Sequence, residues 1–270
     1  MVEELVPPPV EPRPGVGNSY THAWRQLWRN SWRNFFDLLL AGIVYIVVLF
    51  AISFIIGIIF SAGWRDSITS LSSLLFGTSM TNFAWHLLIS SSILQIFLFT
   101  PLFWGLLFLF LCAASARTVE LNHLFDGFRH SYLRVAETSL LWWLVFSAPS
   151  LLIMWLGELN GAVGTFLTVA WFFVSIVLYS RLIYVPFLLM DQGMTGGKAF
   201  STSWEWSRGH ALENFLIFLL GALIMMGGLI VFLVGVIPAA LWFGTAVASQ
   251  YHAVSLEKGN PVVYPSPLVP

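Results

Sequence analysis

The chain has 270 residues, of which 58% are apolar and 9% are charged, and its formal net charge is −1. A soluble domain carries about 25% charged residues, so this composition excludes an ordinary soluble protein and favours one that is solvated by lipid. The near-zero net charge argues against a nucleic-acid partner. The single cysteine, Cys112, excludes an intrachain disulfide and a multi-cysteine metal site.

The first 18 residues form a Pro-rich, acidic segment with too few apolar side chains to fold by itself. We expect a disordered tail with extended polyproline character, which acts as a tether or as a ligand for a partner. A single membrane domain is predicted over residues 19–257, and a short C-terminal tail over residues 258–270.

An amphipathic helix is predicted for Tyr20–Phe36, because aromatic side chains recur there at three- and four-residue spacing. Its aromatic face carries Trp24, Trp28 and Trp32. Its basic stripe carries Arg25, Arg29 and Arg33. Indole rings favour the headgroup region and arginine pairs with lipid phosphate. The tryptophans are therefore the expected interfacial anchors, and the arginines are candidate contacts for anionic headgroups. A nucleic-acid patch is the alternative, which direct continuity with an apolar run disfavours.

Long runs without a charged residue follow, and a bilayer core of roughly 30 Å needs about 20 apolar residues per helix. The runs are Leu38–Phe60, Ala84–Ala116, Thr138–Gly157, Gly161–Ser180 and Asn214–Leu256. The last run is too long for one helix and contains a Gly-Val-Ile-Pro break at residues 235–238. Six transmembrane helices are therefore predicted.

The basic residues give these six spans an orientation. Every Lys and Arg except Arg65 falls at or next to one side of the membrane. By the positive-inside rule, that side and both termini are cytoplasmic, and the chain is expected to be a multi-pass protein of the plasma (inner) membrane. Residues 61–83 and 157–161 are expected outside. Five or seven spans would scatter the basic residues.

Two further cytoplasmic amphipathic helices are predicted, at Arg117–Glu137 and Lys198–His210. Each precedes a pair of spans, as Tyr20–Phe36 does. The expected fold class is therefore all-α: a polytopic membrane protein with six transmembrane helices as three hairpins, each preceded by a cytoplasmic amphipathic helix. These cytoplasmic helices also offer a surface to a protein partner.

Arg181 interrupts an apolar stretch that runs from Ala162 to Met190. Three roles are open for it: snorkelling to lipid headgroups at the cytoplasmic face, a buried ion pair, or contact with a substrate. The carboxylates considered as its partners belong to Asp37, Glu137, Asp191 and Glu213.

One polar face of the helix predicted at Arg117–Glu137 combines carboxylate and imidazole groups, from Glu120, His123, Asp126 and His130. Such groups can hold zinc or iron. One helix alone rarely encloses a metal, however, and a solvated face also explains the pattern. No metal, cofactor or catalytic residue is predicted. The middle of each span lacks Asp, Glu and Lys, which suits lipid or apolar cargo, or no cargo.

A pattern after the fourth span comprises Arg181, Pro186, Asp-Gln-Gly at residues 191–193, Ala199, Ser203, Arg208 and Gly209. It resembles a pattern in a loose group of uncharacterised bacterial six-span membrane proteins. That group is similar to the membrane domain of membrane-anchored glycerophosphodiester phosphodiesterases. The resemblance implies the six-span plan. The phosphodiesterase barrel would need about 250 further residues, so the resemblance implies no such activity and transfers no functional residue.

Three functions remain open. The first is a non-enzymatic membrane scaffold or accessory protein that associates with lipid, as the aromatic-rich interface indicates. The second is a transporter or permease for an apolar or lipid-like solute, which a cavity lined by residues 90–92, Gln95 and Thr100 would favour. The third is an enzyme acting on lipid headgroups at the cytoplasmic face. It would require the carboxylate–imidazole face and Arg181 to converge on one pocket.

Overall fold

The computed structural model describes residues 12–28, 32–61, 92–129, 132–230 and 235–262, and all regular structure within these ranges is helical. This confirms the predicted all-α class. Most of the expected N-terminal tail and outer segment lies outside the described residues. The first helix, α1, begins at Val16, inside the predicted tail.

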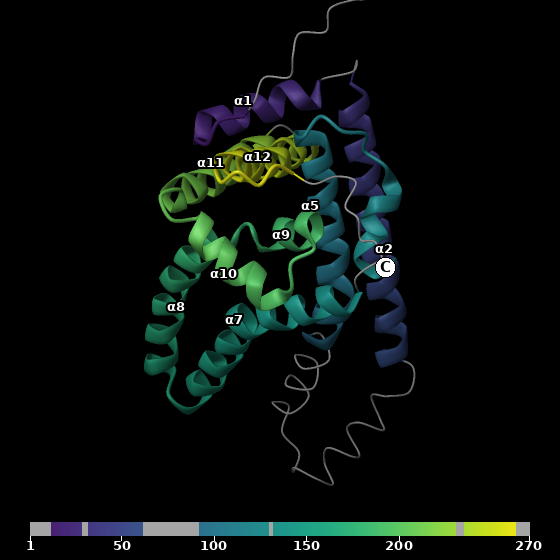
Figure 1. Cartoon of the computed structure of the whole chain (residues 1–270). Coiled ribbons are helices and arrows are strands. Elements are labelled where there is room, and N and C mark those ends of the chain that lie inside the picture. The colour runs from purple at the N-terminus through teal and green to yellow at the C-terminus, as the bar shows by residue number, and fades with distance from the viewer. Residues whose placement is uncertain (1–11, 29–31, 62–91, 130–131, 231–234, 263–270) are drawn as a thin grey trace, which may run out of the picture.

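The first helix and the first apolar helix are separate elements. Helix α1 spans Val16–Leu27 and α2 spans Arg33–Ser61. The single helix predicted for Tyr20–Phe36 is therefore wrong. Trp32, directly before α2, has a φ of 73°, and an L-residue with this left-handed conformation does not continue a right-handed helix. The break lets α1 lie across the end of α2 (Figure 1).

Helix α1 packs on α12, which spans Val236–Glu257. The buried face of α1 consists of Ser19, Tyr20, His22, Ala23, Gln26 and Leu27. The Tyr20 hydroxyl donates to the Ile217 carbonyl at 2.8 Å, and the Trp242 indole N–H donates to the Tyr20 carbonyl at 2.9 Å. Helix α1 is thus fixed to the rest of the protein, and Trp24 is not among its buried residues.

Helix α5, Thr100–Ala114, is the central helix of the core. It follows the π-helical turn η1, Gln95–Phe99, and carries Pro101 in its first turn. Because proline lacks an N–H and its ring clashes with the preceding turn, a local π-turn accommodates it. Helix α5 packs on α12, on the short helix α9 (Val185–Gln192) and on the segment after its own end.

That following segment is not the continuous helix predicted for Arg117–Glu137. It forms a 3₁₀ turn, η2 (Leu121–Phe125), and a short helix, α6 (Asp126–Arg129). The chain reverses at Ala116, whose φ is 61°. It then runs so close to α5 that a Cβ at Gly105 would overlap the Leu124 carbonyl oxygen. This reversal and close approach replace regular helix by turns.

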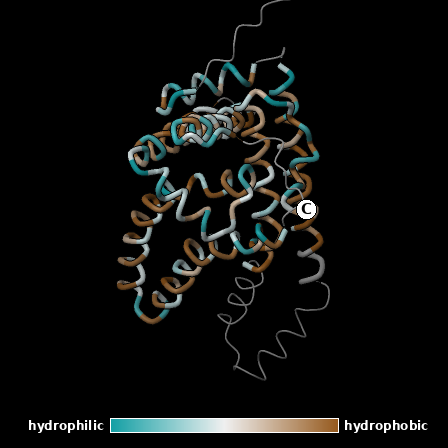
Figure 2. The backbone as a smooth tube through the Cα atoms, viewed as in Figure 1, coloured by the Kyte–Doolittle hydropathy of each residue, from teal (hydrophilic) through white to brown (hydrophobic). Residues whose placement is uncertain are grey.

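Helices α7 (Tyr132–Leu159) and α8 (Gly161–Leu182) form a hairpin that extends away from α2 and α5 (Figure 1). The Asn160 side chain caps α8 by accepting from the N–H groups of its first turn. Figure 2 shows that apolar residues follow both helices along most of their length. Few of their large apolar side chains are buried, as expected for helices facing lipid.

Beyond Arg181 the chain turns inward. Helix α9, Val185–Gln192, is almost entirely buried and ends at Gly193, whose φ is 62°. Helix α10, Gly196–Trp206, agrees with the helix predicted at Lys198–His210. Helix α11, Ala211–Ile230, then packs against α12 beneath α1 (Figure 1).

Five helical stretches are long and apolar enough to cross a membrane: 33–55, 92–114, 132–159, 161–192 and 211–230. The described structure is therefore compatible with a multi-pass membrane protein. The expected sixth span, α12, is not among them. Its 22 residues suffice in length, but from its middle onward it carries the polar, mostly buried residues Thr245, Ser249, Gln250, His252 and Ser255. These lower its hydropathy and face α1, α11 and the core.

Candidate functional site

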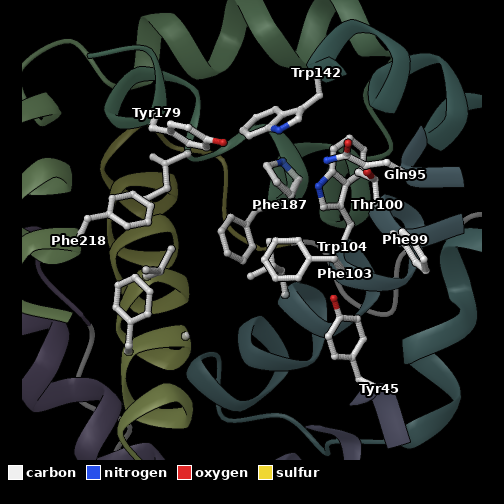
Figure 3. Close-up of a pocket in the computed structure, with 16 residues that line it drawn as sticks. Tyr45, Gln95, Phe99, Thr100, Phe103, Trp104, Trp142, Tyr179, Phe187 and Phe218 are labelled. Atoms are coloured by element: carbon white, nitrogen blue, oxygen red, sulfur yellow. The ribbon is translucent and has the colours of Figure 1, made fainter. Parts of the chain in front are cut away.

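A cavity of about 420 Å³ lies where most of the long helices meet. It is lined from α2, η1, α5, α7, α8, α9, α11 and α12 (Figure 3). The lining residues are Tyr45, Gln95, Phe99, Thr100, Phe103, Trp104, Leu107, Trp142, Tyr179, Ile183, Pro186, Phe187, Phe218, Phe243, Gly244 and Val247. Side chains that are distant in sequence thus share one space.

Aromatic rings dominate this lining. Trp142 connects two others, because its ring centroid lies 6.3 Å from that of Trp104 and 5.9 Å from that of Tyr179. Elsewhere in the lining, the ring centroids of Phe218 of α11 and Phe243 of α12 lie 5.6 Å apart. Aromatic pairs at these separations gain stability beyond the burial of their area, so the walls hold their shape through their own contacts.

The cavity has a buried floor and an open side. Trp104 and Phe187 are only 2% and 1% exposed, whereas Phe103 and Tyr179 are 44% and 43% exposed. Small residues let the helices behind the floor approach closely. A Cβ at Gly244 would contact the Phe110 ring at 2.7 Å, which shows that this small residue of α12 serves internal packing.

Uncharged polar groups are placed around the aromatic walls. They are the hydroxyls of Tyr45, Thr100 and Tyr179, the Gln95 amide, and the indole N–H groups of Trp104 and Trp142. In Figure 3 the Tyr45 hydroxyl points toward the labelled rings, and the Tyr179 hydroxyl lies toward Trp142. None of the lining residues, all in the described part of the chain, carries a formal charge.

The predicted aromatic anchors form a chain of rings at the corner between α1 and α2. Centroid distances are 5.0 Å for Trp24–Trp28 and 4.0 Å for Trp28–Trp32, and Phe35 stacks on Trp28 at 5.2 Å. Trp24 also contacts Trp242 at 5.2 Å. Trp24 and Trp32 remain about half exposed, so the tryptophans are brought together on a surface.

The predicted basic stripe is only partly described. Arg25 and Arg33 are exposed, and Arg33 forms an i,i+4 pair with Asp37 at 3.6 Å. Arg29 lies outside the described residues. Each of the two described arginines directly follows a tryptophan of the cluster formed by Trp24, Trp28 and Trp32, and both are accessible to an anion.

Arg181 has a partner that the sequence did not indicate. Its guanidinium lies over the Trp204 ring, with 5.4 Å from Cζ to the ring centroid. Of its expected partners, Asp37 pairs with Arg33, Asp191 accepts from Tyr251, and Glu213 pairs with His210. Within the described residues, no carboxylate lies within 4.0 Å of the Arg181 side-chain nitrogens.

The carboxylate–imidazole face does not gather around Arg181. His123 Nδ1 lies 2.6 Å from Asp126 Oδ2, and its ring contacts Phe108 of α5. His130 lies outside the described residues. Within the described residues, no group of three His, Cys, Asp or Glu side chains has the geometry of a metal site.

Buried polar contacts that the sequence did not reveal hold α9, α11 and α12 together. The Tyr251 hydroxyl donates to Asp191 Oδ2 at 2.9 Å, and Asp191 is 1% exposed. The Tyr184 hydroxyl donates to Asn214 Oδ1 at 2.8 Å. Polar residues within apolar helices were the available signal, because lipid-facing positions rarely hold them.

The cavity was foreseen only in part. Gln95 and Thr100 line it, as the transporter hypothesis required, whereas Ser92 is not among the lining residues. Ser90 and Ser91 lie outside the described residues. Its main aromatic residues, Trp104, Trp142 and Tyr179, were not singled out. Comparison of the chain with protein-family models, with curated proteins and with solved structures found no match.

Proposed function

We propose that this chain is a non-enzymatic integral membrane protein that holds a lipid-like molecule in its aromatic cavity, in an accessory role. The observation that carries the proposal is the cavity of about 420 Å³ lined by residues between Tyr45 of α2 and Val247 of α12. Small-molecule sites are typically about 300–1,000 Å³, mostly apolar, and supplied with a few placed polar groups. An acyl chain or an apolar ring system matches such a lining, and the open side gives it an entry.

A cavity-filling variant tests this proposal. Leu107 lines the cavity from α5, so Leu107→Trp adds bulk there. Leu152→Trp on the exposed surface of α7 is the matched control. Both proteins are purified in detergent, and co-purified lipid is identified by mass spectrometry. A lipid-like species retained by wild type and by Leu152→Trp, but lost from Leu107→Trp, supports the proposal. Equal retention by all three contradicts it.

A transporter for an apolar or lipid-like solute is the second candidate, favoured by Gln95 and Thr100 on the cavity wall. Transport requires the solute to reach both membrane faces, whereas an accessory protein needs only a stable bound state. Flux of a fluorescent long-chain alcohol across proteoliposomes separates the two. Faster flux with wild type than with Leu107→Trp favours transport.

An enzyme acting on lipid headgroups has less support. It needs His123, Asp126, His130 and Arg181 in one pocket, but His123 pairs with Asp126 beside α5 while Arg181 lies over Trp204 of α10. As part of this proposal, the chain shares the six-span plan of the bacterial membrane proteins that it resembles, and no enzymatic reaction is assigned to it.

The proposed topology has six spans, with α12 as the sixth, and cytoplasmic termini in a bacterial inner membrane. The five apolar helices and the one-sided distribution of basic residues support it. Single cysteines replacing the exposed Glu158 and Ser201 in a Cys112→Ala background test it. A membrane-impermeant maleimide should label position 158 in intact cells, and position 201 only after lysis. Labelling of position 201 in intact cells would overturn the topology.

The proposed membrane contacts lie at the corner between α1 and α2, where the exposed Arg25 and Arg33 directly follow Trp24 and Trp32 of the tryptophan cluster. Anionic headgroups are the expected partners, because arginine pairs with phosphate. Because α1 packs on α12, these contacts have to be tested on the full chain and not on an isolated α1 peptide. Retention of anionic lipid by the full chain, compared with Arg25→Gln/Arg33→Gln, tests them. Unchanged lipid retention in the double variant would exclude these contacts. A protein would then be the remaining candidate partner for the cytoplasmic helices.

A further inference from the structure

We infer that the aromatic cavity selects an uncharged lipid-like molecule that carries a hydrogen-bonding oxygen, such as a long-chain alcohol or ester. It should discriminate against an ionised amphiphile and against a plain hydrocarbon. This inference rests on the proposed function, since it assumes that a lipid-like molecule occupies the cavity.

The first observation is the uncharged lining. The residues around the cavity include no Asp, Glu, Lys, Arg or His, and all of them are described. A carboxylate or phosphate inside would lose its hydration without gaining a counter-ion, which is costly in an apolar environment. Ionised ligands are therefore disfavoured.

The second observation is that the cavity's hydroxyl groups have no protein partner. Within the described part of the chain, Tyr20, Tyr132, Tyr184 and Tyr251 all donate a hydrogen bond to protein. The other two described tyrosines, Tyr45 and Tyr179, have no hydrogen-bond partner among the described residues, and both line the cavity.

Thr100 also lacks the hydrogen bond that other threonine hydroxyls form within their helices. Thr138, Thr165, Thr168 and Thr245 each donate to the carbonyl four residues earlier in their helix. Thr100, on the cavity wall, forms no such bond among the described residues. The hydroxyls of Tyr45, Thr100 and Tyr179 are therefore available to a ligand oxygen.

The third observation is where the donors lie. Trp104, Trp142 and Tyr179 form one connected group, with successive ring centroids 6.3 and 5.9 Å apart. Each presents an N–H or O–H, and hydrocarbon alone would leave these donors unused. Phe187, Phe243 and Val247 supply an apolar wall for the rest of the ligand. A ligand with one oxygen near these donors and a long apolar chain along the apolar wall would match both parts of the lining.

Three probes of equal chain length test the selectivity: hexadecanol, palmitate above its pKa, and hexadecane. Their ability to displace radiolabelled hexadecanol is measured on the purified full chain in detergent. Hexadecanol should displace the label at least about tenfold better than either other probe, the difference expected for one or more hydrogen bonds. Tyr179→Phe and Thr100→Val should each weaken hexadecanol binding roughly two- to tenfold. Thr165→Val, outside the cavity, should not weaken it.

The outcomes separate this inference from the proposed function. Saturable binding that is lost in Leu107→Trp but equal for all three probes, or tightest for palmitate, overturns the selectivity and leaves the cavity function standing. Unchanged hexadecanol binding in both Tyr179→Phe and Thr100→Val also overturns the selectivity without affecting the proposed cavity function. If no probe binds saturably, and Leu107→Trp retains the same lipids as wild type, the proposed function itself fails.

Discussion

The guanidinium of Arg181 lies over the indole ring of Trp204, with 5.4 Å between Cζ and the ring centroid. The backbone carbonyl of Arg181 accepts hydrogen bonds from Ser203 and Ser207 at 2.9 and 2.7 Å. Side chain and backbone of one residue thus both contact α10. Arg181 joins the end of α8 to α10 at the point where the chain turns inward.

We predict that Arg181→Lys is tolerated better than Arg181→Leu, because lysine keeps the charge over the ring. Arg181→Leu should cost about 0.5–1 kcal/mol, as expected for a partly exposed cation–π pair. A double-mutant cycle with Trp204→Leu, followed by thermal unfolding in detergent, measures the coupling. A loss of about 3–5 kcal/mol in Arg181→Leu would instead indicate a stranded buried carboxylate and would contradict the pairing with Trp204.

A substitution at Gly105 should destabilise the fold. A Cβ there would overlap the Leu124 carbonyl oxygen, a backbone atom that cannot rotate away. We expect Gly105→Ala to lower the free energy of unfolding by about 1–3 kcal/mol, as for other overpacked cores. Gly42→Ala is the control, because nothing lies within 4 Å of its Cβ position. Equal denaturation midpoints for the two variants would show that η2 does not pack tightly on α5.

The bond between Tyr251 and Asp191 should be one of the stronger polar contacts of the core. Tyr251→Phe removes the donor to a carboxylate that is 1% exposed. Hydrogen bonds to charged groups contribute about 1.5–3 kcal/mol, and a loss of this size is expected in chemical denaturation. Tyr132→Phe, which loses an exposed bond of 3.2 Å to Phe97, should be nearly neutral. A neutral Tyr251→Phe would be inconsistent with this contact.

The stability of the α1–α12 contact should depend on pH through His22. Burial, and secondarily Arg25, lower the pKa of His22 from 6.5, and its Nδ1 lies 3.0 Å from Ser249 Oγ. The folded state therefore takes up a proton less readily than the unfolded state. Stability should be constant above pH 6.5 and fall as the pH drops toward the folded-state pKa. His22→Gln should flatten the melting temperature between pH 7 and pH 5. An equally steep decline in that variant would assign the effect to another group.

The tryptophan cluster should lie at headgroup depth. Trp24 and Trp32 are about half exposed, whereas Trp28 is ringed by Trp24, Trp32 and Phe35. Replacing all three tryptophans by Ala should weaken stability without changing the number of spans. Lipids labelled with a nitroxide near the headgroup should quench wild-type fluorescence more than that of the triple variant. Fluorescence quenched only by an aqueous quencher would place the cluster in water.

The sequence predicted the features that follow from solvation by lipid. Apolar runs such as Leu38–Phe60 had to be helices, because hydrocarbon offers no partner for backbone N–H and C=O groups. Five such helices are present. The helical character of α10 also followed from its local pattern.

Only the tertiary structure decided how these helices use their polar and aromatic residues. The buried face of α1 depends on α12, more than 200 residues away, where Trp242 bonds to Tyr20. The sequence pattern of α1 instead emphasised its tryptophans. Arg181 lies over Trp204 because α10 packs against α8. The cavity exists because side chains of α2, α5, α7 and α8 converge, and local periodicity carries no information about which distant faces meet.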